Sequence, residues 1–320
     1  MKIIFYGTGN VSLKFLEYLH KNEEVVAVVT SYPRPSGRGL KVVPTPVADF
    51  ARESEIRLFI PEKLTVREIF DGLMPDLGVV VAYGKILPKS IIDYPPGGTI
   101  NVHFSLLPKY RGAAPIQWAL IRGEKKTGVT VFYLDEGIDT GKIIIQEETE
   151  ITDEDNSDSL QEKLIEQGIK LLGKALGEIE KCSGRCKSTK QEGEPSYAPP
   201  LKKTDGLIDW DRTSAEINNL VKGTHPWPGA YSFLKTKEKK IYLIITKAIP
   251  LEVCPGEKEH CLTDMSPGDI TGFEKGLGFV VKCKKGFLLV KRLKPEGKKE
   301  MSCWDFIQGA RVSRGDSFKI

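Results

Sequence analysis

No run of apolar residues in this 320-residue chain reaches the roughly 18 residues that a membrane-spanning helix needs. The opening residues, MKIIFYGTGNVSLKF, lack the charged start, long apolar stretch and small-residue cleavage site of a signal peptide. Six cysteines are too few for a disulfide scaffold in a chain of this length. Cys182 and Cys186 have no second pair and no nearby histidine, so free thiols and no metal site are expected. These absences predict a cytoplasmic protein without a membrane partner.

Neither sign of charge dominates, because 47 Lys and Arg residues face 43 Asp and Glu residues. The balance is nevertheless uneven along the chain: residues 1–204 carry a net charge of −1 and residues 205–320 carry +5. A positive C-terminal part suits a nucleic-acid partner. Lysines scattered on a solvated face explain the same excess equally well.

The first half of the sequence has the pattern of an α/β domain. Apolar runs at Lys2–Tyr6 and Val25–Val29 flank a helical pattern at Val11–His20, which predicts a β-α-β unit with a parallel sheet. Further strands are expected at Leu77–Val81, Thr99–Phe104 and Val129–Leu134, and the clearest helix at Ser159–Lys181. The first turn, GTGNVS, lacks the third glycine of a dinucleotide-binding motif. We therefore predict a Rossmann-like domain at residues 1–188 without a dinucleotide.

The pattern changes after this domain. Residues 183–204 are rich in Ser, Pro, Lys and Glu with few apolar residues, which predicts an extended linker, placed at residues 189–204. Short apolar runs then recur at Ile241–Ile245, Gly278–Lys282 and Phe287–Leu293, separated by turn residues. Such spacing predicts a smaller β domain at residues 205–320, either a barrel or a sandwich.

Three polar residues in the first domain form a candidate site. Asn101 and His103 are two apart on a predicted strand, so their side chains share one face, and Asp139 follows the next strand in the turn EGIDTG. Strand ends are where open α/β sheets carry their chemistry. An amide can stabilise an oxyanion, an imidazole can accept a proton and a carboxylate can orient that imidazole. The set suits acyl transfer to an amine, although such residues also serve as turn caps and hydrogen-bonded core groups.

The stretch that holds these residues resembles the signature of the folate-dependent formyltransferases. The matching segments are Asn101, His103, Ser105–Pro108, Arg111–Pro115 and Gly137–Gly141, with distant anchors at Arg34–Gly39, Val81–Gly84, Ile208–Trp210 and Pro226–Ala230. The resemblance covers nearly the whole chain. It implies a formyltransferase domain followed by an OB-like barrel, and direct transfer of a formyl group from 10-formyltetrahydrofolate to the α-amino group of methionyl initiator tRNA, without a metal.

The resemblance also implies roles for individual residues. Asn101, His103 and Asp139 would be catalytic, and Arg34, Arg38 and Lys41 would grip the acceptor end of the tRNA, although a solvated loop is the plain alternative for these three cations. Residues expected at the folate are Val81, Tyr83, Ile86, Leu87, Ser105, Leu106, Leu107, Pro108, Asp135 and Gly137. Two departures stand out: Phe104 replaces a usually small residue and would narrow the site if it pointed inward, and Gly9-Asn10 replaces a proline-containing turn.

Two other functions fit parts of this pattern. One is a formyltransferase that acts on an amino sugar or another small amine, and the other is a non-catalytic RNA-binding module on the same fold. The second domain and the loop RPSGRG argue against the first, and the intact set of Asn101, His103 and Asp139 argues against the second. We also expect a monomer.

Overall fold

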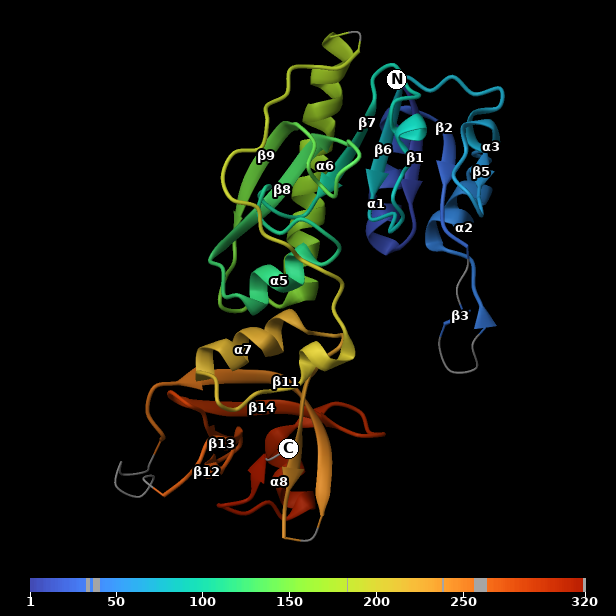
Figure 1. Ribbon diagram of the computed structural model, residues 1–320. Coiled ribbons are helices and arrows are strands. Elements are labelled where there is room, and N and C mark those ends of the chain that lie inside the picture. The colour runs from blue at the N-terminus through green and yellow to red at the C-terminus, as the bar shows by residue number, and fades with distance from the viewer. Residues whose placement is uncertain (33–34, 37–40, 183, 238, 256–263, 319–320) are drawn as a thin grey trace. The chain divides into compact units, whose positions relative to one another are not determined.

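The computed structural model describes residues 1–320 except 33–34, 37–40, 183, 238, 256–263 and 319–320 (Figure 1). The chain forms two compact units. The first consists of Met1–Pro115, Lys126–Glu150 and Gln161–Pro199, and the second of Ile116–Lys125, Ile151–Leu160 and Pro200–Ile320. The second unit thus takes in two segments from the first half of the chain. Within the described ranges, no helix has the length and apolar character to cross a membrane.

The first unit is built on a seven-stranded sheet of order β5-β2-β1-β6-β7-β8-β9. All pairs from β5 to β7 are parallel, whereas β7 with β8 and β8 with β9 are antiparallel. The predicted Rossmann-like α/β class is confirmed, with a mixed sheet. Its strands are β1 (Lys2–Gly7), β2 (Glu24–Val29), β5 (Leu58–Phe59), β6 (Leu77–Val81), β7 (Thr99–His103), β8 (Lys126–Tyr133) and β9 (Ile143–Glu150).

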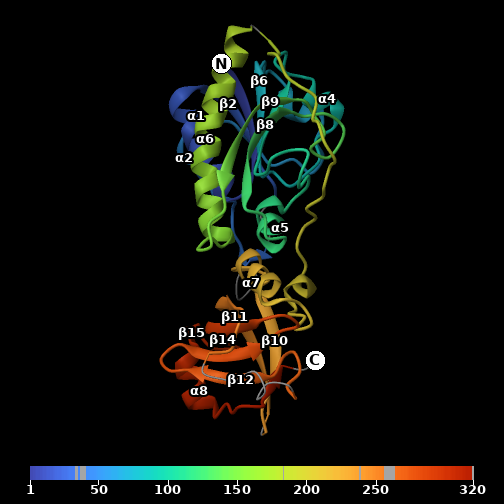
Figure 2. The ribbon, with the colours of Figure 1, turned by 90° about the vertical axis from the view of Figure 1, so that its left-hand side faces the viewer.

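Helices cover both faces of this sheet. In Figure 2, α1, α2 and α6 lie on one side and α4 on the other. Gly168 in α6 allows the close approach to α1, because a Cβ there would meet the Phe15 ring at 2.9 Å. On the opposite face, apolar residues of α3 and α4 pack with Tyr6 and Val80 of the sheet. The helices with residues in this unit are α1 (Asn10–Asn22), α2 (Pro46–Glu53), α3 (Val66–Phe70), α4 (Lys89–Ile92), α5 (Pro115–Ile121) and α6 (Ser157–Lys181).

The second unit is an antiparallel sheet that closes on itself. The order is β12-β13-β14-β11-β10-β16, and β15 pairs with β14. The two edges are joined by backbone hydrogen bonds, from Phe318 N to Gly268 O (2.7 Å) and from Ile270 N to Asp316 O (2.8 Å). This closure removes open edges and gives the barrel-like architecture that the family resemblance implied. The strands are β10 (Ala230–Lys235), β11 (Lys240–Leu251), β12 (Ile270–Glu274), β13 (Gly278–Lys282), β14 (Phe287–Pro295), β15 (Met301–Ser302) and β16 (Ser317–Phe318).

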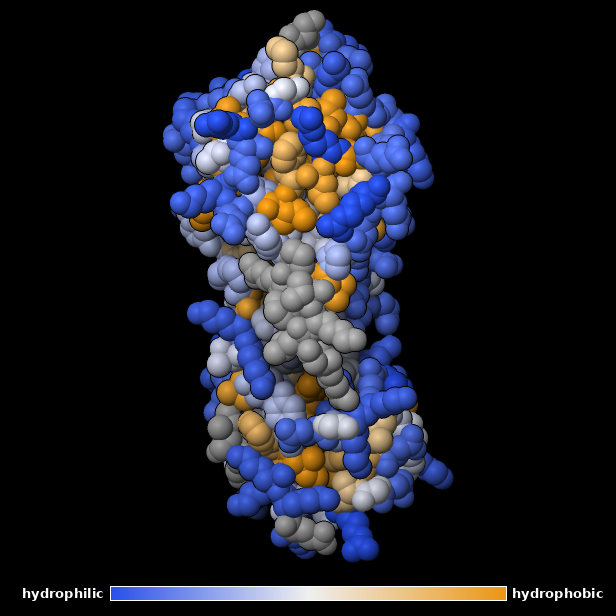
Figure 3. All heavy atoms as spheres, turned by 90° about the vertical axis from the view of Figure 1, so that its right-hand side faces the viewer, coloured by the Kyte–Doolittle hydropathy of each residue, from blue (hydrophilic) through white to orange (hydrophobic). Residues whose placement is uncertain are grey.

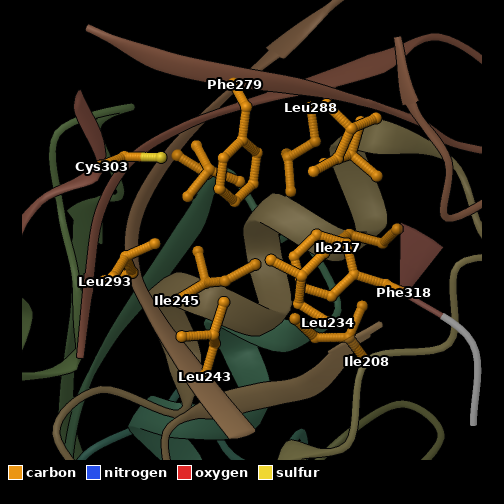
Figure 4. Packing of buried hydrophobic residues seen from close by; sticks show 14 of the residues in the cluster. Ile208, Ile217, Leu234, Leu243, Ile245, Phe279, Leu288, Leu293, Cys303 and Phe318 are labelled. Carbon is orange, nitrogen blue, oxygen red and sulfur yellow. The ribbon is translucent and has the colours of Figure 1, made fainter. Parts of the chain in front are cut away.

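The barrel has an apolar core that side chains from every wall fill. Ile245, Phe279 and Leu288 project from three strands toward Ile217 of α7 and Phe318 of β16 (Figure 4). Burial of side chains of this size contributes about 1.5 to 3 kcal/mol each, which is the main source of the unit's stability. The remaining elements are the single turn η1 (Lys203–Gly206), α7 (Ser214–Gly223), α8 (Cys303–Ala310) and the short ribbon of β3 (Pro35–Ser36) and β4 (Lys41–Val42).

Candidate active site

His103 ends β7, and its ring is hydrogen-bonded at one nitrogen and faces a carboxylate with the other. Its side chain is 6% exposed, its Nε2 lies 2.9 Å from the Tyr110 carbonyl oxygen, and its Nδ1 lies 3.6 Å from Asp139 Oδ2. A carbonyl oxygen can only accept, so Nε2 carries the hydrogen and donates it to Tyr110. In the neutral ring, Nδ1 then holds the lone pair. The basic nitrogen of His103 therefore faces the Asp139 carboxylate.

Asp139 is positioned by the backbone around it. The Gly112 amide donates to Oδ2 at 2.7 Å, which fixes the same oxygen that faces His103. Gly112 has φ +120° and a Cβ there would meet the Ala198 carbonyl oxygen at 2.7 Å, so only glycine can present this amide. Asp139 itself has φ +52°, a left-handed conformation that aspartate tolerates better than most residues. The loop thus presents a carboxylate to the imidazole in one defined orientation.

Asn101 lies on β7 between Val80 of β6 and Phe132 of β8. It shares a face of the strand with His103 and is partly exposed. Its side chain makes no hydrogen bond to any residue within the described ranges, so its amide is available to a ligand. The structure therefore places Asn101 and His103 on one face of β7 and Asp139 beside the His103 ring.

The segment after β7 is folded by its own polar groups. The Ser105 hydroxyl donates to the Lys109 carbonyl (2.6 Å), and Thr130 of β8 donates to the Ser105 carbonyl (2.6 Å). Gln146 donates to the Leu107 carbonyl at 3.1 Å. Ser105, Leu107 and Pro108 are buried and Leu106 is partly buried, so this segment forms a fixed wall rather than a loose loop.

The other residues expected at the folate fall into two groups. Val81, Tyr83 and Leu87 are buried behind the end of β6, whereas Ile86 is 78% exposed. Asp135 and Gly137 are exposed, and Asp135 Oδ1 accepts from the Gly137 amide (3.0 Å) and the Thr140 hydroxyl (2.5 Å). Asp135 therefore shapes the turn that carries Asp139.

Exposed apolar side chains mark the same unit. Ile138, which lies between Gly137 and Asp139 in the turn that the resemblance places at the folate, is 58% exposed. Figure 3 shows apolar residues gathered in a patch on one face of this unit, framed by hydrophilic ones. Such patches are typical of ligand- or partner-binding faces.

Two tyrosine hydroxyls near the end of β6 have no partner. The rings of Tyr6 and Tyr83 meet edge to face at 5.8 Å, and neither hydroxyl forms a hydrogen bond within the described ranges. Burial raises the pKa of both groups, that of Tyr83 to about 12, so both stay protonated donors at neutral pH. A buried hydroxyl without an acceptor lowers the stability of the folded protein. Tyr83 is therefore a candidate for binding a polar group of a ligand.

The two departures from the family pattern have structural outcomes. The ring of Phe104 packs edge to face on Phe15 of α1 at 6.1 Å, so it enters the α1 side of the core. The first turn is tied to β6 by Thr8, which donates to the Tyr83 carbonyl (3.1 Å), and by Ser12, which donates to the Val81 carbonyl (2.6 Å). Gly9 caps α1 and has open space where a Cβ would stand, so no contact requires glycine there.

The predicted linker supplies contacts that the sequence analysis missed. Gln191 donates to the carbonyls of Asp139 (2.8 Å) and Gly141 (2.9 Å) and accepts from Arg111 Nη2 at 2.6 Å. Ser196 accepts the Tyr110 amide at 2.9 Å. These bonds fasten the Asp139 turn to the wall after β7. They involve polar and backbone groups in an extended segment, so no hydrophobic periodicity could have revealed them.

We predict that Gln191→Ala lowers turnover about tenfold while the protein stays folded, because the turn that carries Asp139 loses the hydrogen bonds to its Asp139 and Gly141 carbonyls. Loss of several hydrogen bonds should also reduce the free energy of unfolding by about 1 to 3 kcal/mol. Steady-state kinetics and thermal unfolding would measure both effects. Gln167→Ala, which removes an amide on α6 that bonds to Glu148, is the matched control and should leave turnover unchanged.

The structure describes only part of the loop predicted to contact the tRNA. Arg34 and Arg38 lie outside the described residues, and Lys41 belongs to β4, where only the backbone is described. Across the described ranges, no group of three or more His, Cys, Asp or Glu side chains could hold a metal ion. Cys182 and Cys186 are free thiols.

Two family models match this chain. The one described as formyl transferase covers residues 1–176, and the one described as formyl transferase, C-terminal domain, covers residues 200–311. With the α/β sheet that carries Asn101 and His103 on β7 and Asp139 beside His103, these matches define the class of the protein as a formyl transferase.

Individual relatives narrow the class. The methionyl-tRNA formyltransferase of Endomicrobium trichonymphae is 42% identical over 99% of this chain and 100% of its own length, and that of Thermodesulfovibrio yellowstonii is 43% identical over 99% and 98%. The chain belongs to the methionyl-tRNA formyltransferase family. An N-formyltransferase from Helicobacter canadensis, solved with folinic acid and dTDP-3-aminofucose, shares the fold at TM-score 0.65 and 21% identity, over 94% of this chain and 100% of that one.

Proposed function

We propose that this protein transfers a formyl group from 10-formyltetrahydrofolate to the α-amino group of methionyl initiator tRNA. The observation that carries the proposal is the orientation of His103, whose basic Nδ1 faces Asp139 while the unpaired Asn101 amide lies on the same strand face. The names of the relatives support this acceptor and this chemistry. We infer a monomeric cytoplasmic enzyme.

Each residue of the site has its own role in the formation of the new amide bond. The Asn101 amide donates a hydrogen bond to the oxyanion that develops when the amine attacks the formyl carbon. His103 accepts the proton of the amine at Nδ1, and Asp139 stabilises the imidazolium that results. The ring then returns the proton to the departing nitrogen. Because the amine attacks directly, no covalent acyl-enzyme is needed.

The folate is proposed to lie against Val81, Tyr83, Ile86 and Leu87 after β6. The opposite wall would come from Ser105, Leu106, Leu107 and Pro108 and from the turn that contains Asp135 and Gly137. The partnerless Tyr83 hydroxyl suits a polar edge of the pterin, and the aliphatic side chains suit its faces. When bound, 10-formyltetrahydrofolate supplies the formyl group.

The decisive experiment is a comparison of acceptors. Purified full-length protein with 10-formyltetrahydrofolate should formylate methionyl initiator tRNA with a much higher kcat/KM than free methionine or an amino sugar nucleotide. Equal efficiency on a small amine would establish the small-amine alternative. Binding of tRNA without any formyl transfer would leave a non-catalytic RNA-binding module.

We propose that Arg34, Arg38 and Lys41 contact the acceptor end of the tRNA, because arginine pairs with phosphate and stacks on unpaired bases. Arg38→Ala should reduce kcat/KM about 5- to 150-fold, which corresponds to about 1 to 3 kcal/mol. Arg38→Lys should also have a lower kcat/KM. Lysine keeps the charge but lacks the planar guanidinium group, which presents two parallel N–H donors to a phosphate. The measurement is kcat/KM on methionyl initiator tRNA.

Two controls make the Arg38 result interpretable. Arg52→Ala removes an exposed arginine of α2 that pairs with Asp49 at 3.2 Å, and it should leave kcat/KM unchanged. Folate binding should be equal in all variants. Wild-type efficiency in both Arg38 variants would show that the loop is ordinary solvated surface.

A further inference from the structure

A cavity of about 490 Å³ lies within the second unit. It is lined by the segment before α6, by α7 and by the adjacent strands β11 and β14. In Figures 1 and 2, α7 lies along β11, so the cavity is built on packed elements rather than on a loop tip. Its volume falls in the range typical of small-ligand sites, about 300 to 1,000 Å³.

Two polar side chains in this cavity lack partners. Asn218 of α7 is 6% exposed, yet its amide makes no hydrogen bond to any residue in the part of the chain that the structure describes. Thr246 stands at a bulge in β11, and its buried hydroxyl is also unpaired there. Buried polar groups are normally satisfied, so the Thr246 hydroxyl is an orphan among the described residues, and the unpaired Asn218 amide, which is not sealed from solvent, can bond to the same ligand.

The charges of the cavity favour an anion at its rim. Lys222, Lys247 and Lys291 line it, and none forms an ion pair with any described residue. Of the acidic residues beside it, Asp155 is 2% exposed and already accepts the amide and hydroxyl of Thr152, both at 2.8 Å. Within the described ranges, the three ammonium groups and the exposed Glu154 carboxylate are therefore the unpaired charges that line the cavity, and the ammonium groups can hold a negative group of a ligand.

The other acidic side chains are exposed. Asp153 pairs with Lys125 at 3.4 Å, and Glu154 can accept hydrogen bonds from hydroxyl or amino groups. The apolar part of the wall comes from Val221, Ala248 and Pro250. A flat polar ring fits between such aliphatic side chains while its edge meets an amide, which can donate and accept at once.

We propose that this cavity binds one ribonucleotide unit. Asn218 and Thr246 bond to the edge of the base, the aliphatic wall covers its face, and the lysines hold the phosphate. The ligand is either a free nucleotide or an unstacked nucleotide of an RNA chain, and the second source rests on the proposed function. Formyl transfer and nucleotide binding are located on different residues, so each can fail without the other.

The test uses the full-length protein and each of the four ribonucleoside 5′-monophosphates, with binding followed through the Asn218 side-chain amide by NMR. Thr246→Val should weaken binding about threefold to tenfold, the effect of one lost hydrogen bond, without lowering the melting temperature, because the hydroxyl has no partner in the free protein. Thr127→Val is the matched control, since Thr127 of β8 also has a buried unpaired hydroxyl but lies in the first unit. It should leave binding unchanged.

A second pair of variants tests the phosphate contact. The double change Lys247→Gln and Lys291→Gln should weaken binding at least about tenfold and reduce its dependence on salt. The same double change at Lys275 and Lys298, exposed lysines elsewhere in the unit, should have little effect.

Parallel measurements of tRNA affinity distinguish the sources. Weaker tRNA binding by Thr246→Val assigns the nucleotide to RNA, and unchanged tRNA binding with weaker mononucleotide binding assigns it to a free nucleotide. Equal binding of every probe by wild type, Thr246→Val and the lysine variant would overturn the proposal. Failure of the wild type to formylate methionyl initiator tRNA would overturn the proposed function instead, and would leave the mononucleotide result standing.

Discussion

Replacing His103 with alanine should lower turnover by about 100-fold or more, the typical cost of removing a positioned proton acceptor. In the proposed mechanism, His103 takes up the proton of the amine at Nδ1, which lies 3.6 Å from Asp139 Oδ2. Single-turnover formyl transfer measured with saturating tRNA would isolate the chemical step from binding.

His103 is buried, so the alanine variant also leaves the Tyr110 carbonyl without its donor. His103→Gln separates the two effects, because its amide can still donate to that carbonyl but cannot take up a proton. It should remain folded and inactive. His20→Ala, at an exposed histidine that contacts Phe50, should behave as wild type.

Asn101→Ala should cost a similar factor of about 100 through loss of the oxyanion donor. Its side chain bonds to no residue in the described ranges, so stability should change by less than about 0.5 kcal/mol. A fall in turnover without a fall in melting temperature would assign the amide to catalysis. Near wild-type turnover in either Asn101→Ala or His103→Gln would remove that residue from the mechanism.

The sequence predicted the parts of the fold in which burial is continuous. Strand β6 was predicted with its observed bounds, Leu77–Val81, because all five of its residues are buried apolar positions. The predicted helix at Ser159–Lys181 began only two residues late. In contrast, β9 was missed, since half of its eight residues are exposed polar side chains and its pairing with β8 rests on backbone hydrogen bonds.

Long-range backbone contacts limited the remaining predictions. The apolar runs of the second unit did not distinguish a barrel from a sandwich, because closure depends on amide–carbonyl bonds between residues 268–270 and 315–318. Long-range contacts also limited the prediction of the site. The two-residue spacing placed Asn101 and His103 on one face of a strand. The hydrogen bond from Gln191 to the Asp139 carbonyl could not be predicted, because Gln191 lies in a polar segment with no periodic pattern. The domain bounds at 188 and 204 remain predictions.

The charge of Asp139 can be tested separately from its shape. Asp139→Asn is nearly isosteric, and its side-chain oxygen can still accept the Gly112 amide that now bonds to Oδ2 at 2.7 Å. The turn should therefore keep its conformation, and folding should be intact. The amide cannot stabilise an imidazolium, so we expect turnover to fall by about 100-fold or more.

One comparison decides the role of this carboxylate. Turnover of Asp139→Asn is measured beside that of Glu136→Gln, which removes one charge from an exposed position of the same loop and should have little effect. Full activity of Asp139→Asn would mean that Asp139 acts only as an acceptor that anchors the Gly112 amide.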